Sequence, residues 1–394
     1  MKKMIFGLVA LLFATTSMVA QSNTSDVQQE GEANTASVDQ NGSQNNAATL
    51  QEGFANNAEA IQGSSSFTSR NGVVNQTQIG AENSAFAQHE EDANEIYQEQ
   101  TGINNSASAT QNLLYFGGYN YADQFQEGVA NTATISQEGN GLFGRGEFNE
   151  AYQVQYGENN EALTSQNGAS NFSGILQEGI MNTATMTQIG DSNVAEQLQS
   201  GEANAATGEQ WGSGNRLLQD QEGSGNMATS LQGSSLFDSR NGSVMQVQSG
   251  EENMAFAQHE EDNNQIYQGQ FGDGNSASAT QNLEFFGGEN MTIQDQRGNG
   301  NVATASQEGD VGIFGEGNLV LQYQIGDENI ADSSQNGANN VSDIYQDGVS
   351  NFAQDTQFGI GNSTMVRQTG ATHNSTILQV GTNNAAVVNQ VGGL

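Results

Sequence analysis

Two short runs of this sequence combine a histidine with carboxylates, residue types that commonly bind divalent metal ions. Both runs read QHEED, at residues 88–92 and again at 258–262. The competing interpretation is an acidic, solvated turn without an ion, and the sequence favours it because each histidine stands at a position that is glutamine elsewhere. The candidate metal ligands are His89, Glu90, Glu91, Asp92, His259, Glu260, Glu261 and Asp262.

Other patterns that could support catalysis are weaker. Residues 139–144, GNGLFG, match the GxGxxG pattern of dinucleotide sites, but the chain has 49 glycines and no strand–helix–strand pattern surrounds the match. No lysine follows Lys3, so a Walker-type phosphate loop is excluded, and no acid–base pair stands out from the repeating background. We therefore predict that the protein is not an enzyme, that it has no cofactor, and that any divalent cations bind nonspecifically.

An eleven-residue pattern, QxGxxNxAxxx, recurs from Gln29 to Gln390 and determines which elements could position these residues. Fixed self-similarity of this kind is typical of solenoid proteins. From the Asn to the next Gln, two sets of positions alternate with a period of two, which indicates a β-strand. The xGxx segment is predicted to be the turn, because glycine tolerates positive φ. The Asn position departs from Asn only at Gly72, Gly242 and His373.

We call each eleven-residue repeat an arm. Two arms folded back on each other would make one 22-residue coil. This predicts an all-β, cross-β-like β-solenoid of about 15 two-strand coils, whose inward amides stack on identical residues one coil away. The alternative is a disordered Gln/Asn-rich tract, which would not keep Ala and Gly in phase. The predicted ladder residues include Gln29, Asn34, Gln40, Asn45, Gln51, Asn56, Gln126, Asn131, Gln137, Gln177, Asn182, Gln188, Gln335, Asn340 and Gln346.

A longer repeat overlies the short one. QGSSSFTSRNGVV from Gln62 returns as QGSSLFDSRNGSV from Gln232, and AFAQHEED from Ala85 returns at Ala255. The solenoid, residues 21–394, is therefore predicted to contain a tandem duplication of a 170-residue block, at 62–231 and 232–394.

Insertions interrupt the regular spacing after Gln62, Gln111 and Gln137, and again after their duplicates. When the arm that starts at Gln29 is counted as the first, all insertions fall in even-numbered arms. They should therefore emerge from one edge of the solenoid. One interpretation is a contact surface for a glycan, a surface or another subunit, and the other is that turns tolerate insertions. The aromatic residues of this candidate edge include Phe67, Tyr115, Phe116, Tyr119, Phe143, Phe237, Phe285, Phe286 and Phe314.

The ends and the charge of the chain indicate export. Residues 1–20 have two lysines, a short apolar run and small residues ending at Ala20, which is typical of a cleavable secretion signal. Without that segment, 6 arginines face 45 acidic residues, a net charge of -39. Such a chain is not expected to bind nucleic acid or to insert into a membrane. Cysteine is absent, so no disulfide stabilises it.

The arm QEGxxNxAxxxQ, as at residues 29–40, 126–137 and 177–188, resembles the curlin repeat of the major curli subunits, which form extracellular functional amyloid in bacteria. The resemblance covers essentially the whole chain after the signal segment. It implies a secreted subunit of cell-surface fibres for adhesion and biofilm matrix, exported through an outer-membrane pore and assembled with itself and a nucleator. The great length and the aromatic insertions depart from that family and put a plain fibre role in doubt.

From the residues themselves we also expect assembly, because the repeating register continues to both ends without an evident polar cap. End-to-end addition would extend the amide ladders from one copy to the next. The alternative function is a monomeric, surface-displayed β-solenoid adhesin that binds a glycan or a surface through its aromatic edge loops.

Overall fold

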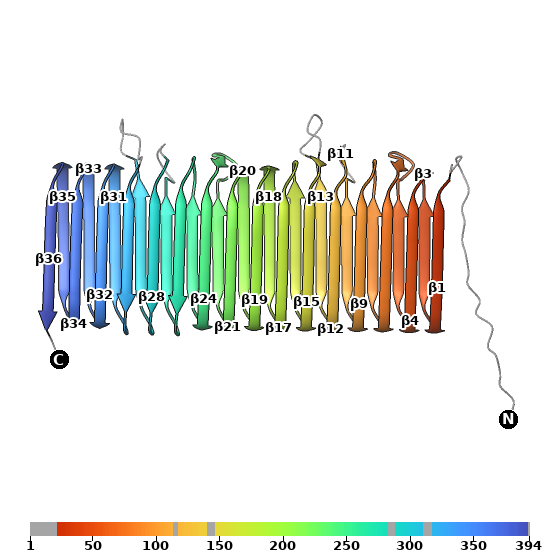
Figure 1. Cartoon of the computed structure of the whole chain (residues 1–394), viewed down its shortest axis with the longest axis horizontal. Helices are drawn as coiled ribbons and strands as arrows, with labels where there is room; N and C mark the ends of the chain where they lie inside the picture. Colours follow the sequence, from red (N-terminus) through yellow and green to blue (C-terminus); the bar gives the residue numbers. More distant parts are fainter. Residues whose placement is uncertain (1–21, 113–116, 140–145, 283–287, 310–316, 393–394) are drawn as a thin grey trace, which may run out of the picture.

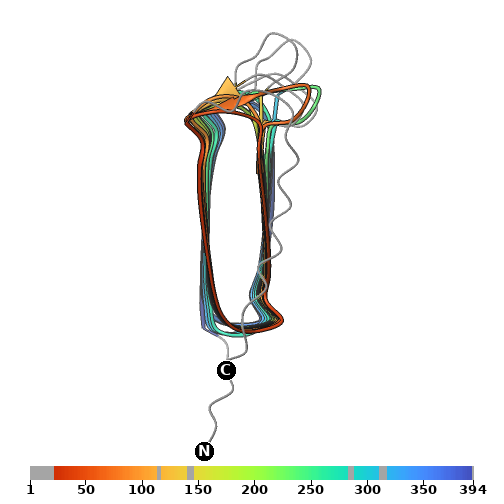
Figure 2. The same cartoon turned by 90° about the vertical axis from the view of Figure 1, so that its right-hand side faces the viewer.

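The computed structural model describes residues 22–112, 117–139, 146–282, 288–309 and 317–392. These residues form strands and turns, with no helix among them. The strands lie side by side along the long axis, from β1 (Thr24–Glu32) at one end to β36 (Ala385–Gly392) at the other (Figure 1). Viewed along that axis, each turn of the chain outlines a narrow, flattened loop with two long walls (Figure 2).

Each wall is one parallel sheet. Sheet 1 contains β1, β4 (Asn46–Phe54), β7 (Val73–Ala81), β9 (Glu95–Ile103), β12 (Tyr121–Val129), β15 (Glu150–Glu158), β17 (Phe172–Ile180), β19 (Val194–Glu202), β21 (Arg216–Ser224), β24 (Ser243–Glu251), β26 (Gln265–Phe271), β28 (Met291–Arg297), β30 (Leu319–Ile325), β32 (Val341–Val349), β34 (Ser363–Ala371) and β36, in that order.

Sheet 2 contains the alternate arms. They are β2 (Thr35–Gln40), β5 (Asn57–Gln62), β8 (Ser84–His89), β10 (Ser106–Gln111), β13 (Thr132–Glu138), β16 (Glu161–Asn167), β18 (Thr183–Asp191), β20 (Ala205–Ser213), β22 (Met227–Gln232), β25 (Met254–His259), β27 (Ser276–Gln281), β29 (Val302–Glu308), β31 (Ile330–Ala338), β33 (Phe352–Ile360) and β35 (Asn374–Thr382). The short strands are β3 (Gly42–Ser43), β6 (Ser69–Arg70), β11 (Gly117–Gly118), β14 (Gly146–Glu147) and β23 (Ser239–Arg240).

The register keeps equivalent positions of the repeat in contact. Gln29 pairs with Gln51 in sheet 1, and Gln40 pairs with Gln62 in sheet 2, each one coil further along the chain. The main path of the two sheets gives fifteen two-strand coils and one further strand, β36. The predicted all-β solenoid of about fifteen coils is therefore confirmed.

The interior is narrow, and large apolar side chains from one sheet pack against alanines from the other. Val74 and Ile96 of sheet 1 lie in one cluster with Ala60, Ala87 and Ala109 of sheet 2. Further along, the large residue changes sides, because Ile135 of sheet 2 packs with Ala122 and Ala151 of sheet 1. This alternation fills the space between the walls at a nearly constant separation.

The glycine of most arms lies within a strand rather than in the turn, which corrects the expectation that the whole xGxx segment turns. Gly31 has φ of 113° and pairs with Gly53 of the next coil. The chain turns two residues later, at Ala33, which has φ of 60°. A Cβ atom on Gly31 would lie 2.0 Å from the carbonyl oxygen of Gly53. Glycine is therefore required by the close approach of the next coil as well as by its positive φ.

The insertions lie at one edge, as their even numbering predicts. They follow Gln62, Gln111, Gln137, Gln232, Gln281 and Gln307, which all end or nearly end strands of sheet 2. The described parts project from one end of the flattened cross-section (Figure 2).

Candidate functional site: the amide ladders and the loop-bearing edge

A single line of glutamine side chains runs the length of sheet 1. Each Nε2 donates a hydrogen bond to the Oε1 of the next glutamine, from Gln29 to Gln390, over 2.6–2.9 Å. All these bonds point toward the C-terminal end. Apart from those at the terminal coils, nearly all of these side chains are almost fully buried, so every bond forms where water cannot replace it.

The same amides also connect the two walls. Gln51 Nε2 donates a second hydrogen bond to the backbone carbonyl of Thr35 in sheet 2, over 2.8 Å. Gln188 of sheet 2 donates likewise to the carbonyl of Phe172 in sheet 1, over 2.9 Å. Each amide thus uses one N–H along the ladder and one across the interior, and a core with few large apolar residues is cross-linked by hydrogen bonds instead.

The asparagines form ladders with the opposite direction. The backbone N–H and the Nδ2 of Asn56 both donate to Oδ1 of Asn34 in the preceding coil, over 3.0 and 3.2 Å. Nδ2 also donates to the carbonyl of Gly80 in the following coil, over 3.0 Å. Asparagine therefore satisfies backbone groups at the corner, where the chain changes sheets and strand pairing ends.

The glutamine ladder of sheet 2 is interrupted twice. The ring of His89 replaces an amide, with its Nε2 3.1 Å from Gln62 Nε2 and its Nδ1 3.3 Å from Ser69 Oγ. Because Gln62 must donate, the ring is neutral and accepts at Nε2. On the other side, Oε1 of Gln111 has no hydrogen-bond partner within the described residues. His259 repeats the arrangement in the second half, with Gln281 in the place of Gln111.

A further row of amides was missed by the sequence reasoning. Gln76, Gln98, Gln124 and Gln153 form an inner ladder in sheet 1, with bonds of 2.8–3.0 Å. A second stretch of this row runs from Gln197 to Gln322. The signal for this row is a QxQ pair at the end of these arms, whereas many other arms have alanine or isoleucine at the first of the two glutamine positions.

All the ladder residues selected from the sequence face the interior and make ladder hydrogen bonds. They are Gln29, Asn34, Gln40, Asn45, Gln51, Asn56, Gln126, Asn131, Gln137, Gln177, Asn182, Gln188, Gln335, Asn340 and Gln346.

The QHEED runs do not bring their side chains together. His89 is fully buried inside the solenoid, and burial lowers its pKa to about 3. Asp92 instead lies at the surface and pairs with Arg70. Glu90 is largely buried, and this burial raises its pKa. His259, Glu260, Glu261 and Asp262 occupy the equivalent positions. Within the described part of the chain, no group of three or more metal-binding side chains could hold an ion.

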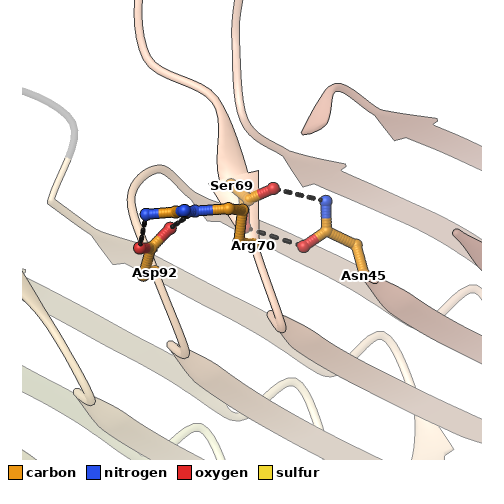
Figure 3. Close-up of polar contacts among 4 residues, drawn as sticks. All are labelled: Asn45, Ser69, Arg70 and Asp92. Atoms are coloured by element: carbon orange, nitrogen blue, oxygen red, sulfur yellow. Dashed lines mark hydrogen bonds and ion pairs between the residues drawn. The ribbon is translucent and has the colours of Figure 1, made fainter. Parts of the chain in front are cut away.

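The bases of the inserted loops continue the ladder pattern at the edge. Ser69 Oγ donates to Oδ1 of Asn45 over 3.0 Å, and Arg70 binds Asp92 through two hydrogen bonds of 3.0 and 2.5 Å (Figure 3). Backbone bridges connect Arg70 to Asp92 and Asp92 to Gly118. The described bases of these insertions therefore form an ordered row along the edge.

The described aromatic residues of this edge are partly exposed. Tyr119 and Phe148 stack with ring centroids 5.3 Å apart, and they are 59% and 55% exposed. Phe67 and Phe237 lie in the two copies of the first insertion. The other candidates, Tyr115, Phe116, Phe143, Phe285, Phe286 and Phe314, lie outside the described residues, as does the expected signal segment 1–20.

These features define a class: a parallel β-solenoid whose interior is ordered by amide ladders, with the cross-β geometry of amyloid in a single chain. The family model described as Curlin associated repeat matches residues 157–190 and 359–392. The chain carries curlin repeats at these two places, and the resemblance to the curlin-repeat family is confirmed. No curated protein matches the chain. The described residues include no helix that could cross a membrane.

Proposed function

We propose that this chain is a secreted structural subunit of extracellular, curli-type fibres that serve adhesion and the biofilm matrix. The observation that supports the proposal best is the uninterrupted ladder from Gln29 to Gln390, in which every amide donates in the same direction. Among the described strands, β1 pairs only with β4, and β36 only with β34. Each end of sheet 1 thus has an open strand edge on which another copy could extend both the backbone and side-chain ladders.

The direction of the ladder sets the polarity of growth. Gln390 would donate to a ladder glutamine in the first coil of the next copy, whereas two like ends would place donors against donors or acceptors against acceptors. Addition is therefore head to tail, which is a heterologous contact that continues without closing. By the same family resemblance, the partners would include a nucleator and an outer-membrane secretion pore.

The test is elongation of preformed seeds, followed by thioflavin fluorescence and negative-stain images. Gln390→Glu keeps the acceptor that Gln368 uses but removes the donor offered to the next copy. We expect this variant to elongate at least tenfold more slowly. Asn389→Asp adds the same charge on the exposed face of the same strand and should elongate like the unchanged chain. Equal rates for all three chains, or no fibres at all, would contradict the proposal.

The second candidate is a monomeric, surface-displayed adhesin that binds a glycan, and the exposed stack of Tyr119 and Phe148 favours it. Exposed clusters of aromatic side chains are common at recognition surfaces. Under this reading, the purified chain stays monomeric for days and binds polysaccharide, and Tyr119→Ala with Phe148→Ala removes that binding. Under the fibre proposal, the same two substitutions leave elongation unchanged.

A further inference from the structure

The outer faces of the two sheets differ in chemistry, although the sequence pattern treats both as solvated. Sheet 2 presents mostly serine and threonine, as at Thr183, Thr185 and Thr187 of β18. Sheet 1 presents many more apolar and aromatic side chains, as at Leu319, Leu321 and Tyr323 of β30. An extended, exposed apolar face on a highly acidic chain commonly marks an interaction site.

The apolar character is greatest over the seven strands β24, β26, β28, β30, β32, β34 and β36, whose outward side chains we call the neutral patch. Its large apolar residues remain accessible: Met291 is 37% exposed, Ile325 39% and Met365 41%. The strands are adjacent in sheet 1, so the patch is continuous.

The internal duplication supplies a comparison at fixed fold position. In the first half, strands β9, β12 and β15 carry five outward carboxylates: Glu95, Glu99, Asp123, Glu127 and Glu150. The residues at the same ladder positions of β26, β28 and β30 are Gln265, Gly269, Ile293, Arg297 and Leu319. Each of these five carboxylates is thus replaced in the second half by a neutral or basic residue, whereas Glu178 of β17 corresponds to Asp347 of β32 and remains acidic.

Arginines neutralise two of the acids that remain in the patch. Arg297 pairs with Asp295 over 3.1 Å and lies 5.9 Å from the ring centroid of Phe271. Arg367 pairs with Asp343 over 2.6 Å and lies 5.7 Å from the ring centroid of Tyr345. The two pairs leave Glu251 and Asp347 as the remaining carboxylates on the outer side of the seven strands. The patch is therefore nearly neutral on a chain whose formal net charge is -37.

We propose that the neutral patch is a lateral interface that packs face to face on the same patch of a second copy of this chain. Seven strands about 4.8 Å apart and about 20 Å of outward positions give roughly 700 Å² per copy. A stable interface buries about 800 Å² per partner, so the patch is of suitable size. Strands β9, β12 and β15 could not pair in this way, because their carboxylates would face one another without counter-charges within these strands.

The same surface on both copies gives a two-fold, closed contact, unlike the head-to-tail contact at the solenoid ends. The inference goes beyond the proposed function and does not depend on it, since two soluble chains can pair without growing. In a fibre, the same contact would join two filaments side by side.

The test restores the acids of the first half. Ile293→Asp with Leu319→Glu introduces the residue types that Asp123 and Glu150 provide at equivalent positions, where the fold accommodates them. Val73→Asp with Val154→Glu adds the same two charges to the first half of sheet 1 and serves as the control. Circular dichroism of each chain verifies that the strands are retained.

Sedimentation velocity of freshly purified, seed-free chain across micromolar concentrations gives the readout. We expect a concentration-dependent dimer in the unchanged chain and in the control, and a dissociation constant raised roughly a hundredfold in the Ile293→Asp/Leu319→Glu chain, since juxtaposed like charges cost several kcal/mol. A chain that is monomeric throughout, a dimer that survives both charges, or a control that dissociates equally would each overturn the proposal. Saturable binding of the monomer to phosphatidylcholine vesicles or to a neutral polysaccharide, lost with the same two substitutions, would overturn it in favour of another occupant.

Seeded elongation of the same chains separates this inference from the proposed function. If both hold, the Ile293→Asp/Leu319→Glu chain elongates but forms fibres of single width in negative stain. A dimer without any fibres would contradict only the fibre proposal. Paired fibres that are unaffected by the two charges would contradict only the lateral interface.

Discussion

Gly72 and His89 occupy one shared space in the corner of the solenoid: a Cβ atom on Gly72 would lie 2.1 Å from Cε1 of His89. Gly72 stands where the repeat has asparagine, and His89 where it has glutamine. Ser69 Oγ bonds both Asn45 Oδ1 and the imidazole, so it takes over contacts that the missing asparagine side chain would make. The two exceptions to the repeat therefore compensate each other, and Gly242 and His259 do the same in the second half.

Gly72→Asn alone should locally destabilise the coil by about 2–4 kcal/mol, because the new side chain overlaps the imidazole. Gly72→Asn with His89→Gln restores the ordinary repeat and should recover most of that loss. Hydrogen exchange of the amides in β8 and β10 measures the effect, since a solenoid does not unfold as one unit. Additive effects of the two substitutions would show that the residues are not coupled.

Acid should weaken the coils that contain His89 and His259. Burial lowers the pKa of both rings to about 3, below the ordinary value of about 6.5. The folded state therefore binds fewer protons than the unfolded state between these values. The contribution of the neutral rings is complete above pH 6.5 and is lost as the pH falls toward 3, at up to about 1.4 kcal/mol per pH unit and histidine.

Local hydrogen exchange, corrected for the intrinsic effect of pH, measures this dependence between pH 7 and pH 5. The matched control carries Gly72→Asn, His89→Gln, Gly242→Asn and His259→Gln, and it retains every carboxylate. Its pH dependence should be shallower in β8 and β25. Identical pH dependence in both chains would exclude the histidines as its cause.

Gln188→Ala should be more costly than its neighbour Thr187→Ala. Removal of the Gln188 amide leaves Oε1 of Gln210 and the carbonyl of Phe172 without a buried donor, and we expect a loss of about 2–4 kcal/mol. Thr187 faces outward, so its truncation should change stability by less than about 1 kcal/mol. Local exchange in β18 and β20 compares the two. Equal losses would mean that strand pairing alone, rather than the amide ladder, stabilises the coil.

Much of this fold could be predicted because the repeat specifies it locally. The alternation from Asn to Gln places residues such as Asn182, Ala184 and Gln188 inward and their neighbours outward. What could not be predicted depends on contacts between coils. The overlap of Gly72 with His89 joins residues of different arms, and the close approach at Gly31 depends on the next coil rather than on its own turn.

The sequence predicts on which edge the inserted loops lie, but not how their bases are arranged. Counting arms places all insertions on one side, but it does not indicate that Arg70 and Asp92 form a row at their base. One eleven-residue pattern describes odd and even arms alike, so it does not indicate the inner glutamine row that begins at Gln76 or the apolar outer face of sheet 1 around Leu319.

Gly179→Ala should prevent normal stacking at its coil. A Cβ atom there would lie 2.0 Å from the carbonyl oxygen of Gly201, and φ is 119°. The backbone at Gly201 cannot move away without breaking the backbone hydrogen bonds between the two coils. We therefore expect the local free energy of unfolding to fall by more than about 3 kcal/mol. Gly174→Ala in the same strand is the control, because the nearest atom, of the Phe172 ring, is 3.6 Å away. Similar exchange protection in both variants would contradict the role assigned to Gly179.

Assembly should be limited by charge and accelerated by calcium. Glu30 and Glu52 pair in register in adjacent coils, and two charges one layer apart repel by roughly 0.9 kcal/mol in water without salt. Every copy added to a fibre meets the same repulsion along a chain whose residues 21–394 carry 6 arginines and 45 acidic residues, a net charge of -39. The lag time of thioflavin fluorescence should be longest at low salt, shorter in sodium chloride, and shortest in calcium chloride of equal ionic strength. Glu30→Gln with Glu52→Gln should shorten the lag at low salt without any added ion. Equal lag times in low salt and in calcium would show that charge does not limit the assembly.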